Sequence, residues 1–372
     1  MRVLICPDKF AGTLSAPQVA EAIAEGWAGV AAESKLTRRP LADGGPGFVE
    51  VLATALGGTR VPVETVDPLG RPVTGEVLVV GDIAYVESAQ ACGLHLLSKD
   101  ERDPRAASSF GLGALLAAAA ESGARTVVVG LGGSATNDGG AGMLAALGAV
   151  SVDKAGAVLP YGGAALAACE RLDGTAVLRG VRLVAATDVD NPLCGLHGAS
   201  NVFGPQKGAS REDVLSLDAA LEHFAGILAR DVPGCPPDVR DLPGAGAAGG
   251  IGAALFALGG TRESGVDLVR SATGLDAALD DADLVITGEG SFDFQSLRGK
   301  LVSGVAAAAT ERGVPCVVVA GQVSVGRREA ASAGVTETHA LVDHFGSVEE
   351  AMAKPAEGLR ALAARLAAQW DR

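Results

Sequence analysis

Carboxylates stand directly after several short apolar runs that have the length of β-strands. They are Asp8 after Val3–Cys6, Asp43 after Ser34–Arg39, Asp188 after Arg182–Thr187 and Glu289 after Leu284–Thr287. In open α/β sheets, ligands bind at the carboxyl ends of the strands. An acidic side chain there can hold Mg²⁺ beside a nucleotide or accept the proton of an attacking hydroxyl. A single Asp in such a place is usually a turn or cap residue. Four carboxylates at four strand ends together predict a ligand-binding or catalytic site.

Three lysines, Lys9, Lys207 and Lys300, stand next to predicted turns. A cation beside a turn can neutralise a phosphate or a substrate carboxylate. A lone lysine is more often solvated at the surface, and that is the expectation for each one taken singly. Lys9 is the first candidate of the three for handling an anion.

The stretch from Gly130 to Gly140 leaves a predicted strand, Thr126–Gly130, and opens a predicted helix, Gly140–Leu147. Glycines allow close approach to a ligand, and free N–H groups at a helix start favour an anion. The stretch matches the dinucleotide pattern G-x-G-x-x-A, with Asp153 at about the right distance. The match is weak because glycine is abundant here, and no G-K-[ST] closes a Walker A loop.

A second glycine-rich stretch, Gly244–Gly252, contains a complete G-x-G-x-x-G. It follows Asp241-Leu242-Pro243 rather than a strand, so the context for dinucleotide binding is missing. Two interpretations stay open for it: a helix start near phosphate, or close packing between helices.

The elements that must position these residues form an α/β pattern. A strand at Val3–Cys6 is followed by a helix with Ser15 as N-cap and Pro17 in its first turn. Antiparallel hairpins are predicted over Arg60–Val66, Arg71–Val80 and Asp82–Glu87, and alternating strands over Leu284–Thr287, Pro315–Ala320 and Thr338–Val342. The simplest architecture is a Rossmann-like parallel sheet built from both chain ends, with the middle forming an inserted second α/β domain. We place the first domain at 1–62 and 280–372 and the second at 63–279.

Length and composition limit the class of protein. The 372 residues suit two α/β domains. A net charge of −14 argues against a nucleic-acid or anionic-membrane partner. The six cysteines are scattered, which disfavours zinc and disulfides and fits a cytoplasmic location. No run reaches the roughly 18 apolar residues of a membrane span, and the N-terminal apolar run is too short for a signal peptide.

Taken together, the motifs resemble one family, the bacterial glycerate kinases of the two-domain α/β type. The matching stretches are Pro7–Phe10 with Gly12–Ser15, Ala42–Gly45, Gly132–Gly140, Ala186–Leu193, Phe203–Gly208, Gly244–Gly252, Thr287–Gly290 and Gln295–Lys300. Each is weak alone, but the ordered set runs across nearly the whole chain. The resemblance implies ATP- and Mg²⁺-dependent phosphorylation of D-glycerate to 2-phosphoglycerate, with the substrates held in a cleft between the domains.

The expected mechanism is in-line phosphoryl transfer with Asp188 as general base. The other catalytic candidates are Lys9 and Asp8. The substrate-binding candidates are Asn191, Asp190, Asn137 and Lys300. The nucleotide- or phosphate-binding candidates are Gly132, Gly133, Ser134, Asp138, Gly139, Gly288 and Glu289. The metal-binding candidates are Asp43 and Glu289.

Two positions depart from the family pattern. Many relatives have lysine after the first Phe of the first motif, where this chain has Ala11, with a lysine instead at Lys9. Many have arginine after Gly-Glu-Gly, where this chain has Ser291. Both departures bear on which cation handles phosphate or carboxylate, while the Asp, Asn and glycine framework is intact.

Three alternatives stay open. One is a glycerate 3-kinase, because no residue identifies the hydroxyl that is phosphorylated. Another is a NAD-dependent 2-hydroxy-acid dehydrogenase, supported only by the two glycine patterns. The last is a module that senses a sugar acid without chemistry, against which the number of carboxylates counts. The oligomeric state is also open, with a homodimer among the options.

Overall fold

The computed structural model describes residues 1–178, 180–298 and 301–371, and the chain folds as two compact units. Unit 1 comprises Met1–Asp43, Glu50–Leu56 and Val266–Arg372, and unit 2 comprises Gly44–Val49 and Gly57–Gly265. Two of the boundaries between these segments fall within the first turns of helix α2 (Phe48–Leu56) and helix α9 (Gly265–Thr273), and the others follow Asp43 and Leu56.

Unit 1 contains a five-stranded parallel sheet in the order β13-β12-β11-β1-β2. Its strands are β1 (Arg2–Ile5), β2 (Lys35–Arg38), β11 (Leu284–Phe292), β12 (Cys316–Val323) and β13 (Glu337–Ala340). Besides α2 and α9, its helices are α1 (Ala16–Ala28), α10 (Leu275–Asp280), α11 (Phe294–Arg298), α12 (Val302–Glu311), α13 (Arg327–Ser332), α14 (Leu341–Phe345), α15 (Val348–Ala353) and α16 (Pro355–Trp370).

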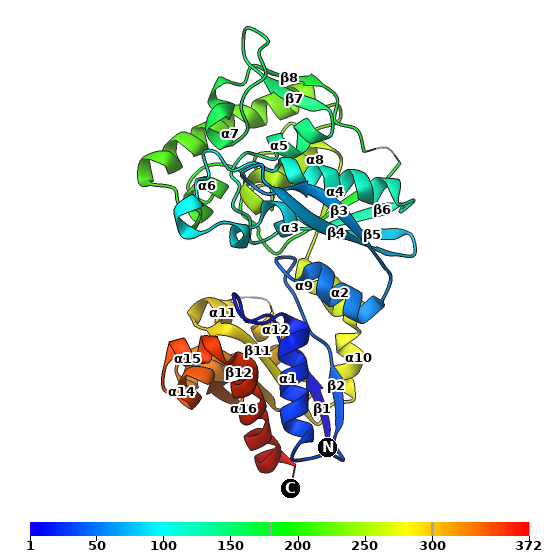
Figure 1. The fold of residues 1–372 in the computed structure, drawn as a ribbon, viewed down its shortest axis with the longest axis vertical. Helices are drawn as coiled ribbons and strands as arrows, with labels where there is room; N and C mark the ends of the chain where they lie inside the picture. Colours follow the sequence, from blue (N-terminus) through cyan, green and yellow to red (C-terminus); the bar gives the residue numbers. More distant parts are fainter. Residues whose placement is uncertain (179, 299–300, 372) are drawn as a thin grey trace. The chain divides into compact units, whose positions relative to one another are not determined.

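Both chain ends contribute to this sheet, as expected for a Rossmann-like unit. Strand β1 pairs with β11, and Val3 lies opposite Leu284. Figure 1 shows the blue strands β1 and β2 beside the yellow-to-orange strands β11 and β12. The N-terminal ammonium also lies 3.5 Å from the Asp371 carboxylate.

The order of connections reverses between β1 and β11. From β1 the chain passes through α1 to β2 on one side, whereas β11, β12 and β13 follow one another toward the opposite edge. Right-handed crossovers in opposite directions place their helices on opposite faces. The loops that leave β1 and β11 therefore diverge, and ligands bind at such switch points in open α/β sheets.

Helices α1 and α16 cover one face of the sheet. Val19, Ile23 and Trp27 of α1 share a buried cluster with Leu359 and Leu362 of α16. The two helices approach closely at Gly26, where a Cβ would lie 2.2 Å from the carbonyl oxygen of Arg360. Helix α1 begins as predicted, with Ser15 in a capping box and Pro17 at its start.

Unit 2 contains a six-stranded mixed sheet in the order β10-β9-β6-β5-β4-β3 and a separate hairpin. The sheet strands are β3 (Thr59–Val66), β4 (Pro72–Val80), β5 (Ile83–Glu87), β6 (Thr126–Gly130), β9 (Arg182–Ala186) and β10 (Thr261–Glu263), and the hairpin strands are β7 (Ala149–Val152) and β8 (Arg171–Gly174). The α-helices are α3 (Ala89–Cys92), α4 (Phe110–Glu121), α5 (Ala141–Ala146), α6 (Ala199–Phe203), α7 (Arg211–Asp231) and α8 (Ile251–Ala257). Short 3₁₀-helices are η1 (Leu94–Leu96), η2 (Lys99–Glu101), η3 (Gly163–Ala168), η4 (Pro205–Lys207) and η5 (Ala247–Gly250).

The predicted hairpins of this unit are confirmed, because β3, β4 and β5 pair antiparallel. Strands β5, β6, β9 and β10 then run parallel, so their carboxyl ends share one edge. Strand β10 escaped prediction because its three residues are too few to show an alternating pattern.

All six cysteines are free thiols. Within the described residues, no helix is both long and apolar enough to cross a lipid bilayer.

Candidate functional site

A cavity of about 450 Å³ opens at the switch point of unit 1. Its walls come from the segment after β1, the ends of β11 and β12, and helices α14 and α15. The residues that line it are Asp8, Lys9, Phe10, Ala11, Thr13, Glu289, Gly290, Ser291, Gly321, Gln322, Leu341, Val342, Val348, Ala351, Met352 and Pro355. Three sequence-predicted residues, Asp8, Lys9 and Glu289, thus meet at one site.

Lys9 lies among carboxylates. Its Nζ is 3.6 Å from Asp8 Oδ1 and 3.9 Å from Asp43 Oδ1. The segment is held in place because the N–H of Asp8 donates to the carbonyl of Gly288, and the N–H of Lys9 donates to Asp8 Oδ1 at 2.7 Å. Lys9 is mostly buried, which strengthens its interaction with any anion in the cavity.

Two carboxyl groups of this cavity have raised pKa values. Burial raises the pKa of Glu289 to about 7, with the nearby Asp8 contributing in the same direction. Burial also raises the pKa of Asp8 to about 6, although Lys9 opposes the shift. Perturbed carboxyl groups that line a cavity are typical of functional sites.

The residues fit a magnesium ion that is shared with a phosphate. Within the described part of the chain, no three His, Cys, Asp or Glu side chains cluster as a complete protein ligand set. Mg²⁺, however, is commonly held by one or two carboxylates with substrate phosphates and water. The buried Oε1 of Glu289 accepts no hydrogen bond from the described residues, which leaves an oxygen suited to such a ligand.

Both departures from the family pattern, Ala11 and Ser291, line this same cavity. Neither side chain carries a charge. Lys9 is therefore the one lysine or arginine among the residues that line the cavity in the described chain.

In unit 2, Asp188 follows β9 at the shared carboxyl edge. Ser264, which follows β10, donates from its Oγ to Asp188 Oδ1 at 2.7 Å. The parallel register of β9 and β10 brings the two residues together, since Glu263 lies opposite Ala186. Ser264 was not among the candidates predicted from the sequence, because its neighbouring strand β10 was not predicted either.

The two other predicted residues of this loop have protein partners. Asp190 is paired with the guanidinium of Arg262. Asn191 donates from Nδ2 to the carbonyl of His197 at 2.8 Å. The loop after β9 is therefore held in place by residues from β10 and from the segment that leads to α6.

The two glycine-rich stretches of unit 2 pack against each other. The N–H of Gly139 donates to the carbonyl of Gly249, and a Cβ on Gly249 would lie 1.9 Å from the carbonyl oxygen of Thr136. A Cβ on Gly132 would lie 2.7 Å from the Cα of Gly45. Close backbone packing thus accounts for the glycines at these positions, and it supports the packing interpretation of Gly244–Gly252.

Asn137 and Asp138 are completely buried in this loop. Asp138 accepts hydrogen bonds from the N–H and Oγ of Ser109 and from the N–H groups of Gly140 and Gly142. Asn137 donates to Ser200 Oγ, while its buried Oδ1 has no hydrogen-bond partner among the described residues. Both side chains organise the loop from within.

Lys207 contradicts the expectation of a solvated side chain, because it is only 2% exposed. Its Nζ donates to the carbonyl of Thr136 at 2.7 Å and to Ser134 Oγ at 3.0 Å. Burial lowers its pKa to about 7, although Asp138 opposes the shift. The buried Lys207 therefore anchors the Gly130–Gly140 stretch. The residues around Lys207 in the sequence, Phe203–Gly208, give no sign of this burial.

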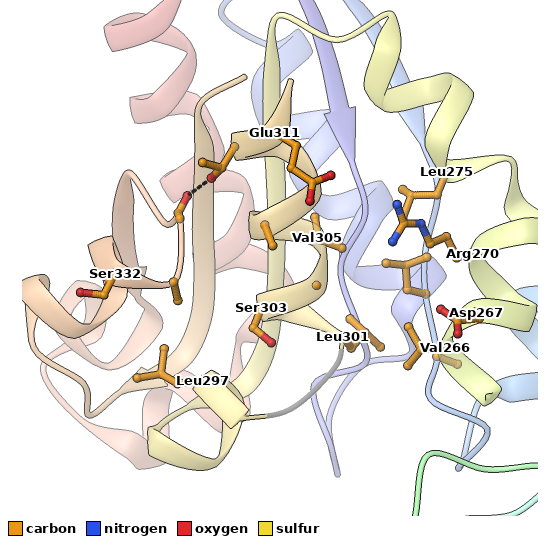
Figure 2. Close-up of a pocket in the computed structure, with 17 residues that line it drawn as sticks. Val266, Asp267, Arg270, Leu275, Leu297, Leu301, Ser303, Val305, Glu311 and Ser332 are labelled. Atoms are coloured by element: carbon orange, nitrogen blue, oxygen red, sulfur yellow. Dashed lines mark hydrogen bonds between the residues drawn. The ribbon is translucent and has the colours of Figure 1, made fainter. Parts of the chain in front are cut away.

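A larger cavity of about 680 Å³ also lies in unit 1 (Figure 2). Its walls include Leu275, Leu301 and Val305, and its guanidinium, Arg270, is bound to both carboxylate oxygens of Asp276. Among the described residues that line it, none is a predicted site residue and the one cation, Arg270, is already paired, so we place the candidate site in the smaller cavity. The remaining candidate, Lys300, lies outside the described residues.

Comparisons with known proteins agree with the motifs. The model of the glycerate kinase family matches residues 3–371. Glycerate kinase of Halalkalibacterium halodurans is 42% identical over 94% of this chain and 93% of its own length. Glycerate 2-kinase of Escherichia coli K12 is 40% identical over the same shares of the two chains.

A crystal structure from Salmonella typhimurium LT2, described as a candidate glycerate kinase 2, superposes with a TM-score of 0.80 at 38% identity. The match covers 100% of this chain and 98% of that one. Sequence and fold therefore agree along the whole length. This chain is a member of the glycerate kinase family, and it is a kinase.

Proposed function

We propose that this protein transfers the γ-phosphoryl group of ATP to the 2-hydroxyl of D-glycerate and releases ADP and 2-phosphoglycerate. The observation that supports it most is the cavity of unit 1, where Lys9 stands beside Glu289, whose buried Oε1 has no partner among the described residues. The choice of the 2-hydroxyl rests on the Escherichia coli relative, which is named glycerate 2-kinase.

On the donor side, Lys9 carries the positive charge that stabilises the transferring phosphoryl group. Asp8 orients Lys9 through the backbone hydrogen bond and the ion pair between them. Asp43 and Glu289 would hold Mg²⁺, which when bound neutralises phosphate charge. Glu289 must lose its proton to serve as a ligand, and its pKa of about 7 allows this near neutral pH.

On the acceptor side, Asp188 takes the proton of the attacking hydroxyl. A bond forms between that oxygen and the γ-phosphorus while the bond from the γ-phosphorus to the bridging oxygen breaks, and ADP leaves with the electron pair. Ser264 holds Asp188 in position through its hydrogen bond. Asn191, Asp190, Asn137 and Lys300 remain the proposed residues for binding glycerate.

The Gly132–Gly140 stretch has a positioning role in this proposal. Lys207 and Asp138 hold it from inside unit 2. The phosphate contacts proposed for Gly132, Gly133 and Ser134 would then come from backbone N–H groups, because these residues bring no cation to the loop. The N–H of Gly139 is already bonded to the carbonyl of Gly249, so Gly139 holds the loop in place instead.

The dehydrogenase alternative loses its support. Both glycine patterns that favoured it are explained by backbone packing within unit 2. Membership in a kinase family contradicts both that alternative and the non-enzymatic sensing module.

The test is ADP release with Mg-ATP and D-glycerate, with the product passed directly to enolase. ADP formation with consumption of the product by enolase is the expected result. A product that enolase consumes only after a phosphoglycerate mutase is added would mean phosphorylation of the 3-hydroxyl. If folded protein releases no ADP above the control without glycerate, ATP-dependent phosphorylation of this acceptor is wrong.

A further inference from the structure

The cavity of unit 1 has an apolar wall in addition to its charged one. Leu341 and Val342 of α14 and Val348 and Met352 of α15 line it. Leu341 is buried in the core of the unit, whereas Val348 is 50% exposed and Met352 is 56% exposed. Large apolar side chains thus remain open to solvent at the cavity that holds Lys9 and Glu289.

The sheet order separates the two walls. The charged groups follow β1 and β11, whereas α14 directly follows β13, which lies at the edge of the sheet. The end of β12 lies between them and contributes Gly321 and Gln322 to the cavity. A ligand that fills the cavity meets charge at one end, an amide side chain in the middle and apolar surface at the other end.

We infer that α14 and α15 form the subsite for the purine base of the phosphoryl donor, an inference that rests on the proposed use of ATP. A purine has a flat apolar face that Val348 and Met352 can cover, and its ring nitrogens can exchange hydrogen bonds with Gln322. The triphosphate is then directed toward Lys9 and Glu289. A three-carbon hydroxy acid has no apolar surface of this extent, so glycerate does not fit this wall.

The apolar wall is built to hold its shape. Ser347 caps α15 by accepting the N–H of Glu350 at 3.1 Å. Ala351 is buried between the exposed positions of the helix and joins the same core cluster as Leu341. The subsite is therefore largely preformed, which reduces the entropy cost of binding.

The experiment compares ATP with inorganic tripolyphosphate, which lacks the base and the ribose, by calorimetric titration of the full chain in the presence of Mg²⁺. The variants are Val348→Asn and Met352→Gln, which are neutral and so leave the field at Lys9 unchanged. Asn and Val have similar helix propensities, so the substitution at Val348, in the first turn of α15, should leave the helix intact. The matched control is Val30→Asn, since Val30 is a 53% exposed valine of unit 1 that does not line this cavity.

The expected result is that each subsite variant weakens ATP binding about fivefold or more, while tripolyphosphate binding stays as in the wild type. Val30→Asn should change neither affinity. Wild-type affinity for ATP in both subsite variants would overturn the inference and leave the proposed function standing. Equal wild-type affinities for ATP and tripolyphosphate would also overturn it. If the wild type binds no ATP and releases no ADP with glycerate, the proposed function fails and the inference with it.

Discussion

Ser264 donates a hydrogen bond of 2.7 Å from its Oγ to Oδ1 of Asp188. The two residues are 76 positions apart in the sequence and follow neighbouring parallel strands, β10 and β9. The hydrogen bond fixes one oxygen of the carboxylate, so the orientation of Asp188 is set before any substrate binds.

Replacing Asp188 with Asn should lower kcat for ADP release by roughly 100-fold or more, because the amide cannot accept the hydroxyl proton. Asn retains an oxygen that can accept from Ser264, so the fold should be preserved. The control is Ser264→Ala, which keeps the carboxylate and should cost only a few-fold in kcat. Turnover of Asp188→Asn within a few-fold of the wild type would show that Asp188 is not the base.

Replacing Lys9 with Met should lower kcat/KM for ATP by about 100-fold, because Lys9 is the one lysine or arginine that lines the cavity in the described chain. Lys35→Met is a suitable control, since Lys35 forms an exposed ion pair with Asp281. Steady-state ADP release at varied ATP measures both variants. Equal loss in the two would point to a general effect of removing positive charge and would contradict a specific role for Lys9.

The raised pKa values of Asp8 and Glu289 predict that unit 1 of the protein without ligands loses stability as pH rises. The folded state holds these protons up to about pH 6 and 7, whereas the unfolded chain releases them near their ordinary values of 3.8 and 4.5. The folded state therefore binds more protons over this range. The free energy of unfolding falls from about pH 4 to about pH 7 by up to about 6 kcal/mol, since a pKa difference of one between the folded and unfolded states corresponds to about 1.4 kcal/mol.

Fluorescence can follow this change in unit 1 alone, because both tryptophans, Trp27 and Trp370, belong to that unit. Urea unfolding of the wild type should give a lower free energy of unfolding at about pH 8 than at about pH 5, and the difference should be smaller in Glu289→Gln. In a separate measurement at these two pH values, Mg-ATP should bind more tightly at the higher pH, since a metal ligand must be deprotonated. An unchanged pH difference in Glu289→Gln would mean that Glu289 does not titrate in this range.

Replacing Gly249 with Ala should destabilise unit 2 strongly, because the added Cβ would lie 1.9 Å from the carbonyl oxygen of Thr136. Gly259→Ala is the matched control: Gly259 also has a positive φ, 84°, but no atom lies within 4 Å of its added Cβ. Gly259→Ala should lower the free energy of unfolding by about 1 kcal/mol through backbone strain, and Gly249→Ala should lower it by at least about 2 kcal/mol more. Tyrosine fluorescence during urea unfolding reports unit 2, which contains both Tyr85 and Tyr161. Equal costs would show that the two glycine-rich stretches do not need their close packing.

The sequence by itself predicted many of the local elements and the family to which the chain belongs. Ser15 and Pro17 predicted the start of α1, and the alternating apolar runs predicted β3, β4 and β5, because such patterns depend on neighbouring residues along one segment. Asp8 and Glu289 could be chosen because parallel strands place their carboxyl ends at one edge. The family was also accessible, since its motifs follow in order along the chain.

Only the tertiary structure decided which distant segments meet. The burial of Lys207 against Ser134 and Thr136 depends on contacts across more than 70 positions of sequence. The packing of Gly139 against Gly249 likewise depends on the path of two separate loops. A glycine looks the same in the sequence whether a ligand or another backbone occupies the space beside it. Only the packed structure determines whether a ligand or another backbone segment fills the space beside a given glycine.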